Sequence, residues 1–87
     1  MTVRYFAAAK AAAGVEEERF DDAQASTLAS LLEEILARPR DVGIPVPELP
    51  RVISRSSFLV NGVATRDQAK PLTPGDTVDV LPPFAGG

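Results

Sequence analysis

The stretch LTPGDTVDVLPPFAGG (residues 72–87) holds a turn, a strand and the exit of the chain from a sheet. Pro74-Gly75 is typical of a type II turn, which needs a positive φ at the glycine. Residues 77–81 then alternate between two faces, and this spacing predicts the last strand of the sheet. Pro82 and Pro83 cannot donate to a ladder of hydrogen bonds, so we expect strand pairing to end there and the remaining residues to leave the sheet.

The opposite end of the chain predicts the strands that this one joins. Residues 2–7 alternate as a strand does, and both faces of that strand carry an apolar side chain. We therefore expect it in the middle of the sheet, covered at least in part on both faces. The alanine-rich residues 7–13 predict a short helical turn that Gly14 ends. Residues 15–20 predict a further strand, whose acidic run Glu16 to Glu18 suits an edge protected from pairing with other chains.

One amphipathic helix is predicted between these strands and the C-terminal ones. Ser26 or Thr27 can cap its N-terminus, and Pro39 is expected to end it within a residue or so. Apolar residues recur at helical spacing and form the stripe expected to face the core, namely Leu28, Leu31, Leu32, Ile35 and Leu36. Residues 39–50 hold four of the eight prolines, which predicts an extended, irregular loop.

The order of elements predicts the fold. Residues 57–60 are predicted as a strand that enters a hairpin at Asn61-Gly62, because that pair supplies the two positive φ angles of a type I′ turn. A right-handed crossover returns the strand after the helix to the same sheet, and the first and last strands are its expected parallel central pair. We predict an α+β fold of the ubiquitin-like β-grasp class, a mixed sheet of four to five strands packed on one main helix. Residues 1–81 would form the domain, and residues 82–87 a flexible, extended C-terminal Gly-Gly tail.

Composition limits what the chain can do. It has 87 residues, 45% of them apolar and 24% charged, which is typical of one folded domain. The formal net charge of −3 argues against nucleic-acid binding. No run of apolar residues is long enough to span a membrane. No basic segment precedes the alanine-rich stretch, so we expect no signal peptide and a cytoplasmic location.

The lack of cysteine and histidine narrows the chemistry further. Without them there is no thiolate nucleophile, no cysteine-type metal site and no side chain that ordinarily titrates near neutral pH. The carboxylates cluster as Glu16 to Glu18, Asp21-Asp22 and Glu33-Glu34, as on a solvated surface. We therefore expect no bound metal or cofactor, and no enzymatic activity of the chain on its own.

The sequence resembles the MoaD/ThiS family of sulfur carriers, and within it the small subunits of molybdopterin synthases. The matching stretches span nearly the whole chain: VRYFAAAKAAAG at residues 3–14, SLLEEI in the helix, LVNG at residues 59–62 and residues 72–87. A terminal Gly-Gly alone is a weak signal. Here it follows a PGD turn, a strand and two prolines, which makes it specific.

This resemblance implies that the chain carries sulfur on its C-terminus as a thiocarboxylate. An adenylating enzyme of the ubiquitin-activating type (MoeB-like) would use ATP to convert the carboxylate of Gly87 to an acyl-adenylate. Sulfur supplied through a sulfurtransferase would then displace AMP. The large subunit of molybdopterin synthase (MoaE-like) would receive the tail and pass the sulfur to a pterin precursor. ATP is consumed by the activating partner, and no nucleic acid or membrane takes part.

The predicted site is the tail itself. Gly87 carries the reacting carboxylate, and the predicted partner-binding residues are Pro82, Pro83, Phe84, Ala85 and Gly86. The glycines can thread a narrow channel because they have no Cβ. The two prolines stiffen the base of the tail, and the phenylalanine offers an apolar anchor.

Other functions stay open at this point. The same thiocarboxylate could serve thiazole or cysteine synthesis, although PPFAGG favours molybdopterin synthase. The same carboxylate could join the chain to protein lysines, as in a ubiquitin-like modifier. The tail could also be inert, as in a non-covalent β-grasp adaptor or the remnant of a linker. Phe84 could pack on the core, and Lys10, at a position that is often basic in the family, could contact a partner or lie in solvent.

Overall fold

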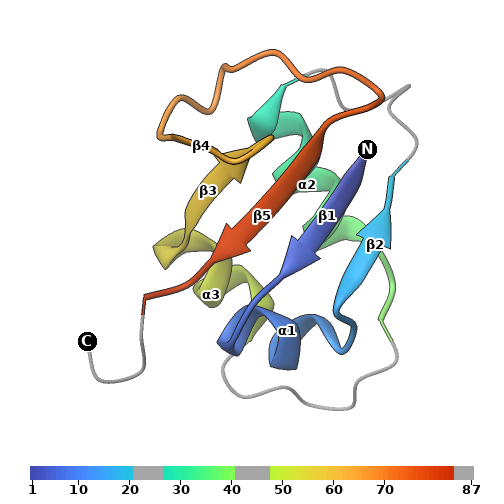
Figure 1. The fold of residues 1–87 in the computed structure, drawn as a ribbon. Helices are drawn as coiled ribbons and strands as arrows, with labels where there is room; N and C mark the ends of the chain where they lie inside the picture. Colours follow the sequence, from blue (N-terminus) through green and yellow to red (C-terminus); the bar gives the residue numbers. More distant parts are fainter. Residues whose placement is uncertain (21–26, 41–47, 84–87) are drawn as a thin grey trace.

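A computed structural model describes residues 1–20, 27–40 and 48–83 of the chain. Within these ranges five strands form one mixed sheet in the order β2-β1-β5-β3-β4 (Figure 1). They are β1 (Thr2–Tyr5), β2 (Glu17–Arg19), β3 (Ser57–Val60), β4 (Val63–Thr65) and β5 (Thr77–Leu81). β1 and β5 run parallel at the centre, and the other neighbouring strands run antiparallel. The predicted parallel central pair is therefore confirmed, and so is the predicted edge position of the acidic strand.

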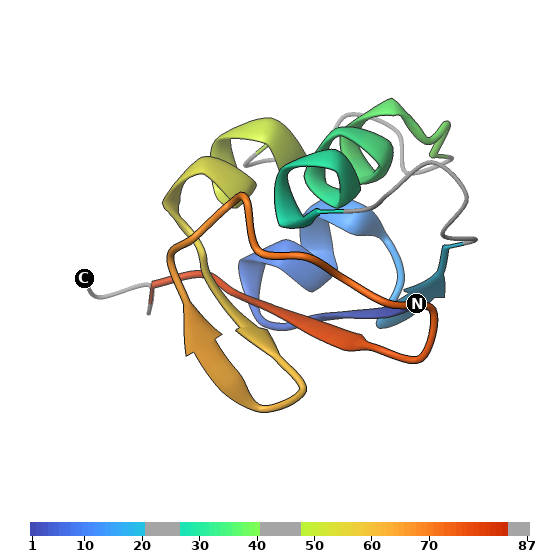
Figure 2. The ribbon, with the colours of Figure 1, turned by 90° about the horizontal axis from the view of Figure 1, so that it is seen from above.

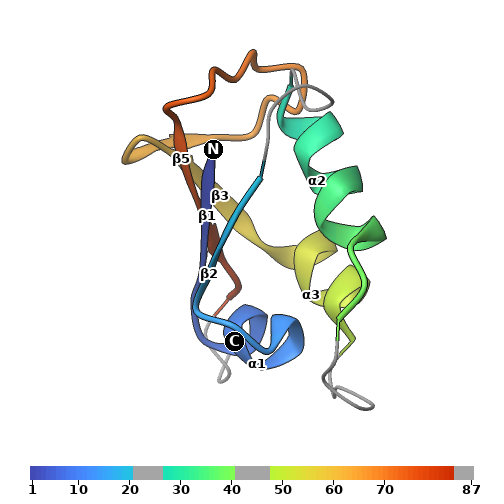
Figure 3. The ribbon, with the colours of Figure 1, turned by 90° about the vertical axis from the view of Figure 1, so that its right-hand side faces the viewer.

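The helices of the described part lie on one face of this sheet (Figures 2 and 3). They are α1 (Ala8–Ala13), α2 (Leu28–Ala37) and α3 (Leu49–Arg55). The arrangement is the β-grasp fold predicted from the sequence, with three helices in the described ranges where one main helix was expected. None of these helices is long and apolar enough to cross a membrane.

Helix α3 overturns part of the irregular loop expected over residues 39–50. Leu49, Val52 and Ile53 recur at i, i+3 and i+4 and are buried in the core. Pro50 lies in the first turn, where a proline removes no helical hydrogen bond. This proline therefore marks the start of a helix. Residues 39–40 and 48 are non-helical as predicted, and residues 41–47 lie outside the described ranges.

Helix α2 begins at a predicted cap. Oγ1 of Thr27 accepts a hydrogen bond from the backbone N–H of Ser30 at 3.1 Å, which satisfies one free donor of the first turn. The helix ends before Pro39, as predicted. Four of the five stripe residues are buried, but Leu36 is 43% exposed. The buried face of α2 is therefore narrower than its apolar stripe.

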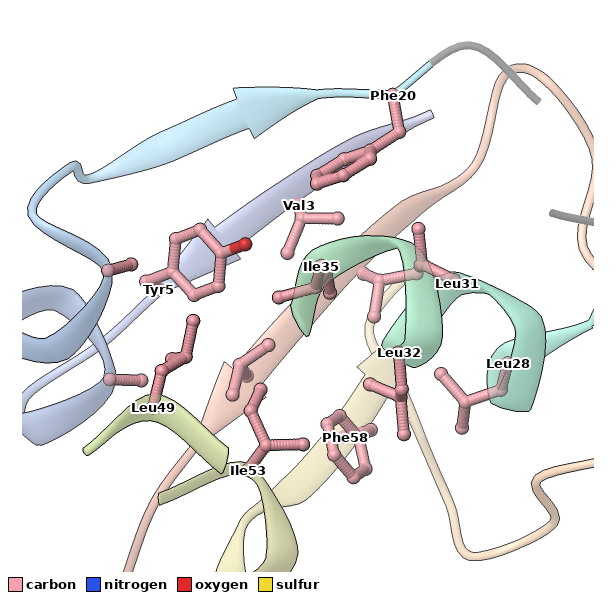
Figure 4. Close-up of a cluster of buried hydrophobic side chains, with 14 of the residues drawn as sticks. Val3, Tyr5, Phe20, Leu28, Leu31, Leu32, Ile35, Leu49, Ile53 and Phe58 are labelled. Carbon is pink, nitrogen blue, oxygen red and sulfur yellow. The ribbon is translucent and has the colours of Figure 1, made fainter. Parts of the chain in front are cut away.

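The core lies between the helices and the inner, helix-covered face of the sheet (Figure 4). Val3, Val78 and Val80 of the parallel pair are completely buried there. Alternate residues of the same strands point to the outer, helix-free face. Arg4 of β1 and the following Phe6 are exposed, so no helix of the described ranges covers this face of the strand, and the expected cover is at most partial there.

Both predicted turns are present, but one has a different geometry. At the β3–β4 hairpin, Asn61 and Gly62 have φ angles of 51° and 83°, the two positive values of a type I′ turn. At Pro74-Gly75, the N–H of Asp76 donates to the carbonyl oxygen of Thr73 at 3.0 Å. Gly75 does not have a positive φ, so the type II prediction is wrong. The Asp76 carboxylate accepts from both the N–H and the hydroxyl of Thr73, which closes the turn without a left-handed residue.

Candidate functional site

The predicted tail starts at the carboxyl end of β5. Leu81 is the last residue of the ladder and lies opposite Ser57 of β3. Pro82 is half-buried and Pro83 is exposed. Because neither proline has an N–H, pairing cannot continue, and the predicted end of the strand is confirmed. The other predicted site residues, Phe84, Ala85, Gly86 and Gly87, lie outside the described residues.

The end of β1 borders this exit. The N–H of Phe6 donates to the carbonyl oxygen of Val80 at 3.3 Å, which extends the parallel register by one residue toward the exit. The Phe6 side chain is 40% exposed. Together with Leu81 and the two prolines, it forms an apolar rim around the base of the tail.

The chain turns from β1 into α1 through a strained residue. Ala7 has φ 51° and ψ −125°, and the N–H of Ala9 donates to the carbonyl oxygen of Phe6 at 3.0 Å. These values make residues 6–9 a type II′ turn, whose first central position is normally glycine. A Cβ at that position costs about 1–3 kcal/mol. The packing of β1 and α1 must therefore hold this turn in place.

A pocket of about 420 Å³ opens beside the turn. Its lining comes from β1, the turn, α1 and the start of β2, namely Arg4, Tyr5, Phe6, Ala7, Lys10, Glu16 and Glu17. Positive and negative side chains are mixed, so the pocket lacks the single sign of charge that would concentrate a charged small molecule. Lys10 is exposed, and its contact with a partner stays a prediction.

An ion pair lies in the middle of the outer face. Arg4 of β1 and Asp79 of β5 are opposite each other in the parallel register. The guanidinium donates Nε–H to Oδ1 at 2.6 Å and Nη2–H to Oδ2 at 2.8 Å, and these hydrogen bonds raise the pKa of Arg4. Asp79 is only 4% exposed, although no helix of the described ranges covers this face, because Arg4 lies across it. Sequence reasoning missed this pair, since its members are 75 positions apart.

A second polar cluster lies at the margin of the core. The Tyr5 hydroxyl donates to Oε1 of Glu18 at 2.7 Å, and Arg40 donates to Oε2 of Glu18 at 2.8 Å and to the carbonyl oxygen of Ile35 at 2.9 Å. Burial, with the hydrogen bond to Glu18, raises the pKa of the Tyr5 phenol. Burial favours the neutral form of Glu18 as well. The hydrogen bonds from Arg40 and Tyr5 and the charges of Arg40 and Arg38 outweigh it and lower the pKa of Glu18. Tyr5 stays protonated and Glu18 ionised at neutral pH, so the cluster ties the chain after α2 to β2.

The described residues therefore place exposed apolar side chains, those of Phe6 and Pro83, at the end of the central strand pair. No three histidine, cysteine, aspartate or glutamate side chains of these residues gather as a metal site requires. The reactive group predicted from the sequence is the carboxylate that ends the chain.

Comparison with known proteins identifies the family of this chain. The model of the ThiS family matches residues 3–87. A molybdopterin synthase sulfur carrier subunit from Chlamydomonas reinhardtii is 34% identical over 86 residues, which cover 98% of this chain and 95% of that protein.

Several solved structures share the fold. Subunit 1 of a molybdopterin converting factor from Pyrococcus furiosus is 26% identical, with a TM-score of 0.72 over 95% of both chains. SAMP1 from Haloferax volcanii is 23% identical, with a TM-score of 0.69 over 100% of this chain and 98% of that one. A chain from the complex of subunits 1 and 2 of the molybdopterin-converting factor of Helicobacter pylori is 21% identical, with a TM-score of 0.67 over 99% and 96% of the two chains. At these last two identities, the likeness concerns the fold.

Proposed function

The chain belongs to the ThiS family, the MoaD/ThiS type of sulfur carrier, and from this premise we propose that it is the small subunit of a molybdopterin synthase. Its Gly87 carboxylate is adenylated, converted to a thiocarboxylate and used to deliver sulfur to a pterin precursor. The observation that carries the proposal is the 34% identity, over 98% of the chain, to a molybdopterin synthase sulfur carrier subunit.

The chemistry begins with activation, because a carboxylate repels nucleophiles and has a poor leaving group. An oxygen of the Gly87 carboxylate attacks the α-phosphate of ATP, which forms an acyl-adenylate and releases pyrophosphate. The terminal sulfur of a partner's persulfide then attacks the acyl carbon and AMP leaves, which gives an acyl disulfide. A second thiol of the partners attacks the partner's own sulfur in that disulfide, so the S–S bond breaks, the thiocarboxylate is released and the partners keep a disulfide.

The thiocarboxylate sulfur then bonds to a carbon of the pterin precursor in place of an oxygen substituent, which gives a thioester. Water attacks the acyl carbon of this thioester, so the acyl C–S bond breaks, the sulfur stays on the pterin and the carboxylate is restored. The chain has neither histidine nor cysteine, so partners supply the proton transfers and the sulfur.

The geometry at the end of β5 supports this role. Residues 82–87 reach at most about 20 Å when extended, far enough to enter a buried site while the domain stays docked outside. Pro82 and Pro83 reduce the freedom that the tail loses on insertion. The apolar rim formed with Phe6 and Leu81 gives a partner a surface beside the entrance. The lack of cysteine also leaves no thiol in the chain to attack the activated acyl group.

The partners follow from the same scheme. A large subunit (MoaE-like) receives the tail. The molybdopterin-converting factor of Helicobacter pylori, one chain of which shares this fold, is a complex of subunits 1 and 2. An adenylating enzyme (MoeB-like) and a sulfurtransferase are required by the activation and sulfur-transfer steps. The chain thus acts as a carrier in the cytoplasm, and the catalytic groups lie on its partners.

Mass spectrometry tests the carrier chemistry. After incubation with a cognate adenylating enzyme, ATP and a sulfur donor, the intact chain should gain the mass of one oxygen-to-sulfur exchange, and fragmentation should place it on Gly87. A gain on another residue, or no gain with a cognate activator, contradicts the proposal.

Two tail variants serve as controls. Deletion of Gly87 and Gly86→Val should leave the free energy of unfolding within about 0.5 kcal/mol, because these residues follow the last strand. Both should abolish or severely reduce charging and delivery, since a β-branched side chain obstructs a glycine-sized channel. Normal charging and sulfur delivery by the valine variant would show that sulfur transfer does not require a glycine-sized tail.

A second candidate is a ubiquitin-like protein modifier. The observation that favours it is the structural likeness to SAMP1, a small archaeal modifier protein. A modifier would be recovered from its native host in isopeptide linkage to lysines of other proteins. A molybdopterin synthase subunit would instead be recovered with its large subunit and as a thiocarboxylate. A carrier for thiazole or cysteine synthesis would form the same thiocarboxylate but would not support molybdopterin formation.

A further inference from the structure

Strand β2 forms one edge of the sheet, and in the described part no strand pairs with its outer side (Figure 3). The N–H of Tyr5 donates to the carbonyl oxygen of Glu16 at 2.9 Å, and the N–H of Phe20 donates to that of Met1 at 2.8 Å. Even-numbered residues of this strand therefore direct their backbone groups toward β1. Since alternate residues of a strand point these groups to opposite sides, Glu17 and Arg19 direct their N–H and C=O groups outward.

We propose that a second copy of this chain pairs with this edge, antiparallel, about a two-fold axis that passes through Glu18. In this register Glu17 of each copy lies opposite Arg19 of the other. Each such pair exchanges two backbone hydrogen bonds. The Glu17 and Arg19 side chains are exposed and lie on the outer face, so a carboxylate meets a guanidinium on each side of the axis.

The charge pattern selects this register. A shift of two residues in one direction places Glu17 opposite Glu17, and a shift in the other places Arg19 opposite Arg19. Like charges directly opposite each other across two strands are destabilising. The acidic edge therefore disfavours pairing with unrelated strands, as charged edges do, while remaining complementary to itself.

The negative charge of Glu18, the residue on the axis, is balanced by positive side chains of its own chain. Glu18 would face the other copy's Glu18 on the helix-covered side of the sheet. Its carboxylate already accepts hydrogen bonds from Tyr5 and Arg40, and it lies 3.6 Å from the guanidinium of Arg38. Arg38 is itself held over the ring of Phe20 at 3.8 Å. Two positive charges therefore stand beside each carboxylate and reduce the repulsion across the axis.

The pairing leaves the end of β5 accessible. In the sheet order β5 is separated from the β2 edge by β1, so the apolar rim around Pro83 is not covered. Because the two copies run antiparallel, their tails leave the joined sheet at opposite ends. The inference stands independently of the proposed function, and it is compatible with partners that engage each tail.

A charge-exchange experiment by sedimentation equilibrium tests the pairing. The wild-type chain should dimerise reversibly with a dissociation constant on the order of 0.1–1 mM, as suits a small interface. Glu17→Arg alone and Arg19→Glu alone should each weaken self-association about tenfold or more, because each places like charges opposite each other. An equimolar mixture of the two variants should associate as the wild type does, and so should the double variant.

Matched controls separate register from net charge. Glu33→Arg on α2 and Arg51→Glu on α3 change exposed residues far from β2 by the same charge, and they should leave the association unchanged. The amide protons of Glu17 and Arg19 should exchange with solvent more slowly at dimer-forming concentrations. Thermal melts establish that each variant is folded.

Any of four results would overturn the proposal. One is a wild-type chain that stays monomeric at about 1 mM. Another is undiminished association of either single variant. The third is a mixture of folded single variants that fails to associate. The fourth is a dimer in which the amides of Glu17 and Arg19 exchange as fast as in the monomer.

Discussion

The two faces of the central strand pair share one backbone and differ in chemistry. On the inner face, Val3, Val78 and Val80 are removed from water, which stabilises the fold by about 25 cal/mol for each Å² of apolar surface buried. On the outer face, Arg4, whose side chain is half exposed, pairs with the nearly buried Asp79, and because solvent reaches one partner the pair contributes less than this apolar burial. The fold therefore depends mainly on the inner face, and the outer face contributes less to its stability.

The inner face should give the largest effect. Leu31→Ala opens a cavity where α2 covers the sheet, because Leu31 is completely buried, and it should lower the free energy of unfolding by about 2–5 kcal/mol. Leu36→Ala on the exposed side of the same helix is the matched control, with a change within about 1 kcal/mol. Denaturant melts measure both. Equal losses would show that the buried side of α2 has been assigned wrongly.

Substitution of Glu18, at the margin of the inner face, should give the next largest loss of stability, and this loss should depend on pH. The folded-state pKa of Glu18 lies below its ordinary value of 4.5, so its ionised form stabilises the fold above about pH 4.5, and this contribution is lost as pH falls through the folded-state pKa. Glu18→Gln should therefore be less stable than wild type at pH 7, and the difference should shrink toward pH 3. The pKa of Asp76 is lowered too, but it affects both proteins alike. A difference independent of pH would exclude this role of Glu18.

On the outer face, the effect should be smaller and confined to the ion pair. Asp79→Asn keeps the shape of the side chain and removes its charge, and it should cost less stability than Leu31→Ala. Arg4→Met combined with Asp79→Asn should cost less than the sum of the two single changes, because either one breaks the pair. Chemical denaturation of the wild type, the two single variants and the double variant gives the four free energies of this double-mutant cycle. Strict additivity would mean that the pair contributes nothing to the fold.

The smallest change in stability, a gain in place of a loss, is expected at the turn between β1 and α1. Ala7→Gly removes the strain of a positive φ from the type II′ turn. Glycine also gives the unfolded chain more conformational entropy, so the free energy of unfolding should rise by at most about 1 kcal/mol. Ala11→Gly, inside α1 and also exposed, should instead destabilise by about 0.5–1 kcal/mol. Thermal melts compare the two. If both glycines destabilise alike, Ala7 is not strained.

The sequence predicted what depends on local pattern. Alternation identified β1 and β5, and Asn61-Gly62 identified the hairpin. Helix α3 was not predicted, because the prolines of residues 39–50 indicate irregular chain, although the spacing of Leu49, Val52 and Ile53 is helical. The apolar character of Leu36 does not reveal that α2 turns it outward.

The site was predictable only in part for a similar reason. The end of the last strand at Pro82 and Pro83 follows from the absence of their N–H groups, so it could be inferred from sequence. The burial of Asp79 depends on the register that brings Arg4 across from it, and no local pattern contains that register. The same holds for the contact of Glu18 with Arg40. The roles of residues 84–87 stay predictions, since these residues lie outside the described ranges.

The pairing of β1 with β5 affects when the chain can fold during its synthesis. The two strands at the centre of the sheet come from opposite ends of the chain, with Arg4 and Asp79 75 positions apart, so this contact closes late and folding of this kind is slow. A ribosome makes the first strand early and the last strand at the end. A chain that stops short of β5 leaves β1 without its central neighbour and exposes the inner face. We therefore expect a chain that ends before β5 not to fold, whereas a chain that ends between Leu81 and Gly87 can still fold.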